Sequence, residues 1–179
     1  MTKLGLCAIL VFSLTVGTAA SEPPQTFTVS VKTVEPFVYV CISHTGPLTA
    51  IQDVVGNLFL YMQQQEVTPM GEMIGVYHTD PSKGEPEKQQ WEIGFPVSEH
   101  AFPLQPLQRK EWVFTEVATA IHTGTPDMTG ETVAKINEWL EVNGYEVAGP
   151  VLEQYSNFDP RNPNKTSLQI EIWVACRKK

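Results

Sequence analysis

The segment Gly71-Glu72-Met73-Ile74-Gly75-Val76-Tyr77-His78 has a counterpart about 78 residues further along the chain, Gly149-Pro150-Val151-Leu152-Glu153-Gln154-Tyr155. Recurrence of this kind indicates two copies of one supersecondary unit, and it predicts a seam between the copies where a small ligand can be sheltered. Only one copy carries an acid at the matched strand position, because Gly75 in the first corresponds to Glu153 in the second. This acid points to the functional half of the chain.

Shorter motifs recur in the same order around these segments. His44-Thr45-Gly46 returns as His122-Thr123-Gly124, and Asp80-Pro81 returns as Asp159-Pro160 after one inserted residue. Hydrophobic periodicity divides each copy into a strand, a helix and two further strands. Helices are expected from Ile51 to Met62 and from Thr129 to Leu140. Strands are expected at 27–33, 37–42, 73–78, 91–97, 112–120, 151–155 and 167–176.

These elements predict an α+β fold, built as a pseudo-two-fold duplication of a strand-helix-strand-strand unit. The sheets are expected to be antiparallel, with the helices on one face and a ligand cleft on the other. Repeat one is expected at about 27–97 and repeat two at about 111–176, joined by a Pro-containing linker over 98–110. Alternate residues of a strand point to opposite sides of a sheet. The face away from the helices is therefore expected to display an aromatic and acidic set: Glu153, Tyr155, Tyr77, Trp173, Glu92 and Tyr39.

Residues 1–20 have the pattern of a cleaved export signal. Lys3 precedes an apolar run from Leu4 to Val16, and the small residues Thr18-Ala19-Ala20 follow. A buried first helix or a membrane anchor is the alternative, but the run is short for a bilayer core of about 30 Å. We therefore expect a periplasmic or secreted protein, bacterial in character, with one domain at 21–179 and no stable membrane insertion after cleavage.

The chain is acidic, with 12 Lys and Arg against 20 Asp and Glu and a formal net charge of −8. Affinity for nucleic acid depends on clustered cations, so nucleic acid is not expected as a partner. A negative field favours cationic ligands, although solubility of an exported protein explains the charge equally well. Charge does not distinguish a monomer from a homodimer.

Two cysteines follow the export segment, Cys41 and Cys176. An oxidising compartment permits a disulfide between them, and two buried free thiols are the alternative; the sequence leaves both open. Neither cysteine lies in a CxxC pair or near a His at ligand spacing. Redox catalysis and a zinc site are therefore poorly supported, and no metal or cofactor is expected.

The arrangement resembles the GyrI-like small-molecule-binding family, which also supplies the effector domains of multidrug-sensing transcription activators and shares its fold with SOUL-type haem proteins. The resemblance covers roughly residues 27–176. It rests on the order and duplication of short motifs. The segments 71–78 and 149–155 are each followed by an Asp-Pro pair, Asp80-Pro81 and Asp159-Pro160. The other motifs are the strand Trp91-Glu92-Ile93-Gly94-Phe95-Pro96-Val97 and the helix end Trp139-Leu140 before Asn143-Gly144-Tyr145.

The resemblance places the family's pocket acid on Glu153 and implies a carboxylate among aromatic rings that binds a lipophilic, cationic ligand. Some members of the family are hydrolases for strained or activated small molecules. In that alternative Glu153 is the general acid or base, and Tyr155 or Tyr77 orients the substrate. A protein-interaction module is a third hypothesis. The sequence contains no helix-turn-helix segment, so a transcription role is not supported.

Each candidate also has a purely structural interpretation. Glu153 can be a solvated carboxylate of a strand, and Tyr77 and Tyr155 can be packing residues of the sheet. Trp173 is more simply a residue that covers the sheet surface. His44 and His122 lie in matched turns, where hydrogen bonding to nearby backbone explains them better than ligation of a metal or haem.

Overall fold

The protein is described by a computed structural model over residues 27–79, 85–123, 125–156 and 169–179. Within these ranges eight strands form one sheet in the order β1-β6-β8-β7-β3-β4-β2-β5, and every pairing is antiparallel. The strands are β1 (Ser30–Thr33), β2 (Phe37–Thr45), β3 (Met73–Tyr77), β4 (Gln90–Pro96), β5 (Gln108–Trp112), β6 (Glu116–His122), β7 (Tyr145–Ser156) and β8 (Gln169–Lys178).

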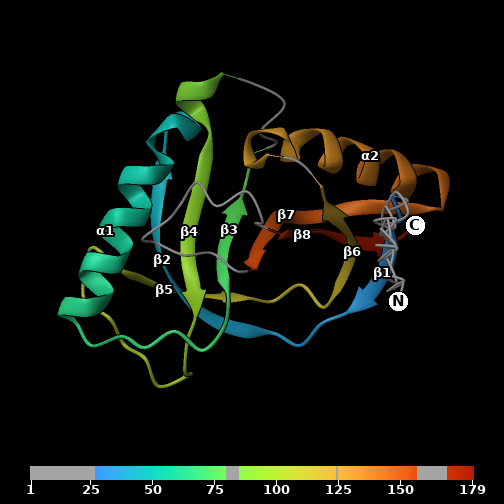
Figure 1. The fold of residues 1–179 in the computed structure, drawn as a ribbon. Coiled ribbons are helices and arrows are strands. Elements are labelled where there is room, and N and C mark those ends of the chain that lie inside the picture. The colour runs from blue at the N-terminus through green and yellow to red at the C-terminus, as the bar shows by residue number, and fades with distance from the viewer. Residues whose placement is uncertain (1–26, 80–84, 124, 157–168) are drawn as a thin grey trace, which may run out of the picture.

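The sheet consists of two halves with the same order of elements. The half β2-α1-β3-β4 precedes the half β6-α2-β7-β8, with α1 at Ile51–Gln64 and α2 at Thr129–Val142. The halves meet where β3 pairs with β7, and β1 and β5 lie at the two edges (Figure 1). The α+β class and the strand-helix-strand-strand order expected from the sequence are confirmed.

At the junction of the halves Gly75 lies directly opposite Glu153. These two residues occupy matched positions in the recurring segments, and the flanking pairs, Met73 with Tyr155 and Tyr77 with Val151, are arranged symmetrically around them. The local two-fold relation between the halves therefore passes through the Gly75–Glu153 pair. The glycine and the acid at this matched position therefore lie in the middle of the strand order.

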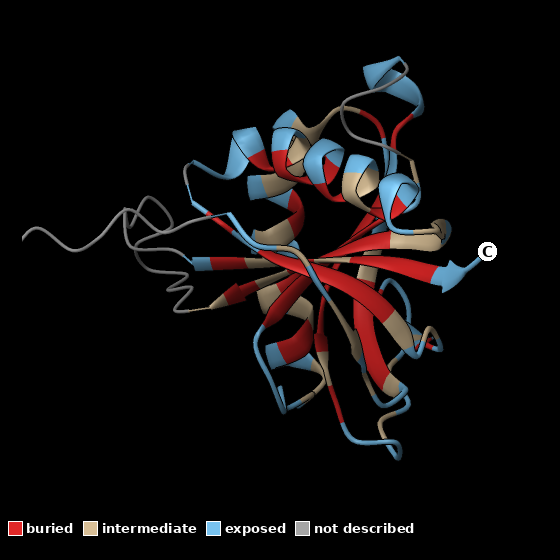
Figure 2. Ribbon diagram, turned by 90° about the vertical axis from the view of Figure 1, so that its right-hand side faces the viewer, coloured by how far each residue is buried: buried red, intermediate tan, exposed pale blue. Residues whose placement is uncertain are grey.

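Both helices cover the same face of the sheet. Helix α1 packs on β2 and β4, and α2 packs on β6, β7 and β8. The predicted apolar stripes form the contacts, because Val54, Leu58 and Met62 of α1 and Val133, Ile136 and Leu140 of α2 are buried. Figure 2 shows the buried residues of α2 directed toward the sheet and the exposed ones outward. Helix α2 ends before Gly144, whose φ of 78° confirms the predicted stop.

The predicted linker over 98–110 and the predicted strand 112–120 need correction. Residues Gln108–Trp112 form β5, which pairs with β2, and β6 begins only at Glu116. Strand β5 was not predicted from the sequence because this edge strand carries charged residues and follows a Pro-rich segment. Charged side chains are typical of edge strands, since they discourage pairing with other chains.

The face assigned to the acid and tyrosines is also corrected. Gly75 pairs with both Ile93 and Glu153, and Glu153 pairs with Ile172. Residues opposite each other in neighbouring strands point to the same side of a sheet, and Ile93 and Ile172 belong to the core under the helices. Glu153, Tyr155 and Tyr77 therefore lie on the helix side.

The other three predicted site residues lie on the opposite face of the sheet. Tyr39 belongs to a second core cluster with Cys41, Ile74 and Val76, and Trp173 packs against that cluster. Glu92 contacts Tyr39 there. The six predicted residues thus divide three and three between the faces, and the expectation of one aromatic and acidic surface away from the helices is wrong.

The two cysteines, Cys41 and Cys176, are free and buried. Strands β2 and β8, which carry them, are separated by three other strands, and the side chains belong to core clusters on opposite faces. Neighbouring strands lie about 4.8 Å apart, so the Cα atoms are far beyond the reach of a disulfide. Of the alternatives left open by the sequence, two buried thiols is the one observed.

A glycine in the centre of β4 provides a test of this packing. A Cβ on Gly94 would lie 2.3 Å from the Val40 carbonyl oxygen and 2.8 Å from the Cys41 Cβ, whereas a Cβ on Gly56 of α1 would meet no atom within 4 Å. We expect Gly94→Ala to lower the free energy of unfolding by about 1–3 kcal/mol through overpacking. The matched Gly56→Ala should raise it by about 0.5–1 kcal/mol through the gain in helix propensity. Urea denaturation measures both, and equal stabilities would contradict this packing.

Candidate functional site

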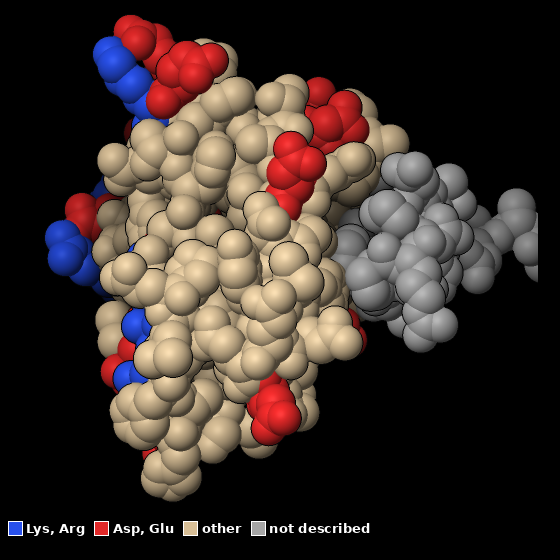
Figure 3. All heavy atoms as spheres, turned by 90° about the vertical axis from the view of Figure 1, so that its left-hand side faces the viewer, with Lys and Arg blue, Asp and Glu red and all other residues tan. Residues whose placement is uncertain are grey.

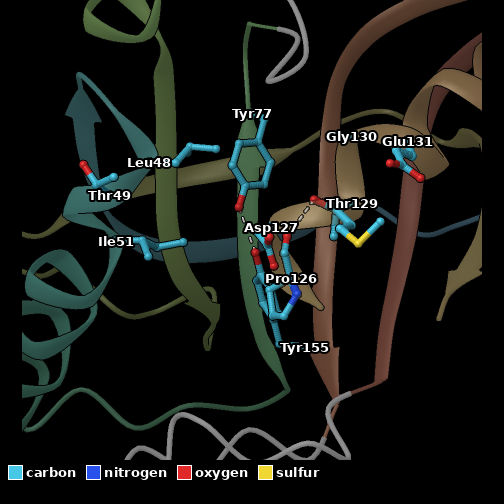
Figure 4. Close-up of a pocket in the computed structure, with 11 residues that line it drawn as sticks. Leu48, Thr49, Ile51, Tyr77, Pro126, Asp127, Thr129, Gly130, Glu131 and Tyr155 are labelled. Atoms are coloured by element: carbon cyan, nitrogen blue, oxygen red, sulfur yellow. Dashed lines mark hydrogen bonds between the residues drawn. The ribbon is translucent and has the colours of Figure 1, made fainter. Parts of the chain in front are cut away.

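A cavity opens on the helix side of the sheet, between the beginnings of the two helices. Its volume is about 710 Å³. One wall comes from the start of α1 and the 3₁₀ turn η1 (Leu48–Ala50) before it, and the other from the start of α2 and the turn η3 (Pro126–Met128). Tyr77 of β3 and Tyr155 of β7 lie between them (Figure 4). The lining residues are Leu48, Thr49, Ile51, Tyr77, Pro126, Asp127, Met128, Thr129, Gly130, Glu131 and Tyr155.

The two tyrosines are joined to Glu153 by a chain of hydrogen bonds. Tyr155 Oη donates to Glu153 Oε2 at 2.6 Å, and the Tyr77 and Tyr155 hydroxyl oxygens are 2.8 Å apart. Because Tyr155 has one hydroxyl proton and gives it to Glu153, Tyr77 is the donor in the second bond. Figure 4 shows the two hydroxyls directed toward each other. The chain connects the cavity to a carboxyl group that is only 2% exposed.

Gly75 makes room for this arrangement. A Cβ at this position would lie 3.0–3.1 Å from the Tyr77 ring and from the hydroxyl oxygens of Tyr77 and Tyr155. Real Cβ atoms are rarely this close to other atoms, so any larger residue would displace the tyrosine pair. An acid at both matched positions would also bring two carboxylates together in a buried site. The asymmetry of the recurring segments therefore has a steric and an electrostatic reason.

The carboxyl of Glu153 lacks the partners that a buried charge requires. Burial raises its pKa, and the hydroxyls of Tyr155, Thr129 and Tyr77 together with His122 oppose this effect without cancelling it. In the described ranges, Glu153 Oε1 has no hydrogen-bond partner and no ion pair to Lys or Arg is seen. An unsatisfied buried acid of this kind is a candidate functional group.

The tyrosine hydroxyls share the same environment. Burial raises the pKa of both Tyr77 and Tyr155 well above the ordinary value, and the Glu153 charge adds to the effect. Both phenols are therefore neutral hydrogen-bond donors at any physiological pH.

His122 is the last residue of β6 and lies behind this site, whereas the sequence had placed it in a turn. Its Nε2 is 3.0 Å from the Thr125 carbonyl oxygen, to which it donates, and its Nδ1 is 2.9 Å from the Thr132 hydroxyl. In the neutral ring, Nδ1 therefore accepts from Thr132. These bonds tie the end of β6 to Thr125 before η3 and to Thr132 of α2, so His122 positions one wall of the cavity.

The opposite face of the sheet holds a different polar cluster, centred on Glu92. Its carboxylate accepts hydrogen bonds from Tyr39 at 2.8 Å and from Lys110 at 2.5 Å, and His78 Nε2 is 2.6 Å away. Burial acts to raise the pKa of Glu92, but the bonds from Lys110, His78 and Tyr39 outweigh it and the pKa is lowered. Burial, with Glu92 beside it, also raises the pKa of the Cys41 thiol to about 12. Glu92 is thus a paired structural charge.

Trp173 lies on that face as well. Its ring is 6.4 Å from the Trp112 ring, and the Lys32 ammonium lies 4.4 Å from its centroid. Lys32 also forms an ion pair with Glu171 at 2.7 Å. Trp173, Tyr39 and Glu92 therefore belong to the packing of the outer face and do not line the cavity, whereas Tyr77 and Tyr155 do and Glu153 is bonded to Tyr155.

The sequence analysis did not identify the cavity residues contributed by the two helix starts. A signal for them exists in the recurring His-Thr-Gly motifs, because His44 and Thr45 end β2 shortly before η1 and His122 ends β6 shortly before η3. A two-fold relation between the halves brings both helix starts to the seam. Combined with the expected duplication, these motifs could have indicated that residues 48–51 and 126–131 face one another.

Two further observations concern the described part of the chain. It contains no group of three or more His, Cys, Asp or Glu side chains placed to hold a metal ion. Neither of its α-helices has the length and apolar character needed to cross a membrane.

The two buried acids should give opposite pH dependences of stability. The pKa of Glu153 is raised in the folded protein, so its contribution is complete below the pKa of the unfolded chain, about 4.3, and is lost as pH rises through the folded value. We expect the melting temperature of Glu153→Gln to increase relative to the wild type as pH rises from 4 to 8. A difference that is constant with pH would show that Glu153 does not titrate as a buried, unpaired acid.

Glu92→Gln is the matched comparison, because the pKa of Glu92 is lowered. Its stabilisation is present above the unfolded pKa and is lost as pH falls through the folded value. The variant should lose on the order of 2 kcal/mol at pH 7, the range for hydrogen bonds to a charged group, and much less near pH 3. Denaturation curves at both pH values measure the two losses.

Comparisons with known proteins agree with this geometry. The sequence model of the GyrI-like small molecule binding domain matches residues 27–177. A comparison with curated proteins found no match. Among solved structures, the EcmrR C-terminal domain has a TM-score of 0.75 at 14% identity, over 87% of this chain and 100% of that one.

Two other solved structures are similar at lower scores. A hydrolase encoded by lin2189 from Listeria innocua has a TM-score of 0.62 at 12% identity, over 83% of this chain and 91% of that one. SAV2435 bound to tetraphenylphosphonium has a TM-score of 0.51 at 11% identity, over 84% of this chain and 94% of that one. At these identities the structures establish a shared fold alone, and the match over most of the sequence shows that the chain belongs to the GyrI-like small molecule binding domain family.

Proposed function

We propose that the cavity captures lipophilic organic cations and that Glu153 supplies the negative charge that selects them. The observation that carries this proposal is the unpartnered oxygen of a buried Glu153, linked through Tyr155 to Tyr77 at the wall of the cavity. A buried acid without a counter-ion is costly in the free protein. A cation entering the cavity offsets that cost, whereas a neutral ligand of the same shape does not.

The cavity has suitable dimensions and chemistry for such ligands. Its volume of about 710 Å³ lies within the usual range of roughly 300–1,000 Å³ for small-molecule sites. Leu48, Ile51, Pro126 and Met128 supply apolar walls. The tyrosine rings present negative faces, and each cation–π contact contributes on the order of 0.5–2 kcal/mol. Rigid aromatic and aliphatic walls with one buried charge favour selection by charge and bulk over recognition of one exact structure.

The tyrosine pair lies between the Glu153 carboxyl and the cavity, and it therefore determines how strongly that charge acts on a bound ligand. Tyr77 and Tyr155 line the cavity and Glu153 does not, so a ligand meets the tyrosines first. Asp127 and Glu131 at the wall add to the negative potential. When a cation binds, Glu153 is stabilised in its ionised form, and the hydroxyls remain oriented toward the carboxylate as donors. Binding is therefore accompanied by loss of a proton when Glu153 starts protonated.

Similar structures support the choice of a probe. The structure of SAV2435, which has this fold, contains bound tetraphenylphosphonium. This ion is lipophilic, permanently charged and lacks hydrogen-bonding groups, so its binding reports on charge and shape alone. It is a suitable first ligand for this chain.

Hydrolysis in the same cavity is the second candidate. The donors run from Tyr77 through Tyr155 to Glu153, so a proton taken from a bound nucleophile at Tyr77 can be relayed through the two hydroxyls to the Glu153 carboxylate, which then acts as the general base. A structure of the same fold belongs to a hydrolase from Listeria innocua. Capture remains the first proposal because Glu153 itself does not line the cavity and cannot activate a bound water molecule directly.

We also propose that the protein is exported, as a periplasmic or secreted binding protein. The basis is the pattern of Lys3, the apolar run and Thr18-Ala19-Ala20 in residues 1–20, which lie outside the described residues. Two buried thiols with no disulfide are compatible with either side of a membrane.

Tetraphenylphosphonium should stabilise the wild-type protein against thermal unfolding. At a concentration of 100 times the dissociation constant, the stabilisation is about 2.7 kcal/mol. In Glu153→Gln we expect affinity to fall at least tenfold, because the amide keeps the shape of the side chain and removes its charge. Triphenylphosphine oxide, a neutral analogue, should bind both forms equally. Thermal shift and isothermal titration calorimetry measure these affinities.

Glu141→Gln is the control for overall charge, because this exposed acid of α2 lies outside the cavity lining. It should bind the cation as the wild type does. Equal loss of affinity in both variants would show that only the general negative field matters. Turnover of an activated ester by the wild type but not by Glu153→Gln would instead favour hydrolysis.

Processing should remove residues 1–20 when the whole sequence is expressed in a bacterial host. The mature protein is expected in the periplasm or medium with Ser21 as its first residue, because Ala20 ends the small-residue motif. N-terminal sequencing and intact mass determine the cleavage point. Recovery of an uncleaved chain from the membrane fraction would favour the anchor alternative.

A further inference from the structure

A second surface lies at the C-terminal end of α1, away from the cavity. Three large apolar side chains there are largely exposed: Met70 at 70%, Phe102 at 78% and Leu104 at 74%. All three line one groove of about 720 Å³, between the end of α1 and the segment 98–104. We call this surface the Phe102 patch. Single exposed apolar residues are ordinary, but three around one groove indicate a contact surface.

The patch is held rigid by hydrogen bonds at both ends of the segment 98–104. Gln65 clamps Leu104, because its side-chain nitrogen donates to the Leu104 carbonyl oxygen at 3.0 Å and its side-chain oxygen accepts from the Leu104 amide at 2.7 Å. Arg109 donates to the Glu99 carbonyl oxygen at 3.2 Å and lies 5.5 Å from the centroid of the Phe102 ring. A segment whose backbone is bonded at both ends loses less entropy on binding a partner than a free loop does.

The Phe102 patch combines a protruding ring and a groove on the same surface. Phe102 projects into solvent, and the groove beside it is bounded by Gln64, Val67, Thr68 and Met70. A two-fold axis places the same patch of each copy against the other, so it requires a surface that is complementary to itself. A ring adjacent to a groove meets this requirement, because each copy can insert its Phe102 into the groove of its partner.

The distribution of charge permits two acidic copies to meet on this side. With a net charge of −8, two copies repel each other across most orientations. Helix α1 carries one acid, Asp53 in its first turn at the far end from the patch, and no Lys or Arg, whereas α2 carries Glu131, Lys135, Glu138 and Glu141. Figure 3 shows the face over α1 to be largely free of charged side chains. The acids of this surface are Glu66 in the groove lining and Glu99 in segment 98–104, and Arg109 supplies a positive charge beside Glu99, to whose carbonyl oxygen it donates.

We propose that the protein forms a two-fold homodimer in which Phe102 of each copy occupies the groove between α1 and segment 98–104 of the other. The interface lies apart from the lining of the ligand cavity, so each copy keeps its own site. Leu60, 47% exposed and one helical turn before Gln64, extends the contact along α1. The proposal is independent of ligand identity and of the role of Glu153.

Sedimentation velocity over a concentration series tests the dimer, with protein purified from cells expressing the whole sequence. The wild type should show a concentration-dependent dimer, and Phe102→Asp should be monomeric or weaken the dimer at least 100-fold, because it places a charge in the apolar groove. Val142→Asp is the matched control, since Val142 is 85% exposed on α2 and lies outside the patch. A wild type that is monomeric throughout, or a Phe102→Asp form that dimerises as the wild type does, overturns the proposal.

Cross-linking tests the orientation and does not depend on the aspartate variant. Phe102→Cys protein mixed with Thr68→Cys protein should yield a disulfide-linked dimer on mild oxidation, because Thr68 lines the groove that receives residue 102. The native Cys41 and Cys176 are buried and should not contribute. A wild-type dimer with no cross-link in the mixture would place the interface elsewhere and overturn the proposal. Circular dichroism confirms that each variant is folded.

Discussion

The pairing of β3 with β7 is the constraint on which the rest of the structure depends. It joins the two halves through the residues opposite each other at their centre, Gly75 and Glu153. Because one is a glycine, the space above the pair is available for the hydroxyls of Tyr77 and Tyr155. Because the other is an acid, those hydroxyls are held in a hydrogen-bonded chain. The acid and the tyrosine pair thus lie together at the junction of the two halves.

The two buried acids of the sheet show how neighbours decide the role of a carboxylate. Glu92 and Glu153 are equally buried, each 2% exposed. Glu92 has a lysine, a histidine and a tyrosine as partners, and its pKa is lowered, which identifies it as a paired charge in the packing of the outer face. Glu153 has a tyrosine at one oxygen and its pKa is raised. Only the second arrangement leaves a carboxyl oxygen without a hydrogen-bond partner among the described residues.

Much of the fold was predictable because helices, turns and strands are indicated by patterns of residues that are near one another in the sequence. Apolar periodicity located both helices, and Gly144 marked the end of the second. The recurring segments predicted the strand-helix-strand-strand order of each half. The edge strand β5 was not predicted, because its charged residues are typical of its place at the sheet edge, which is a tertiary property.

The sequence by itself determined the polar centre of the site: one acid in one of two recurring segments, with Tyr77 and Tyr155 at matched positions on their strands. Only the tertiary structure decided which face of the sheet they occupy. Strand alternation relates residues within one strand, but the face that a strand turns toward the helices depends on its register with its neighbours, set by contacts between distant segments. That register placed Glu153 under the helices with its two tyrosines, and it placed Tyr39, Glu92 and Trp173 on the opposite face.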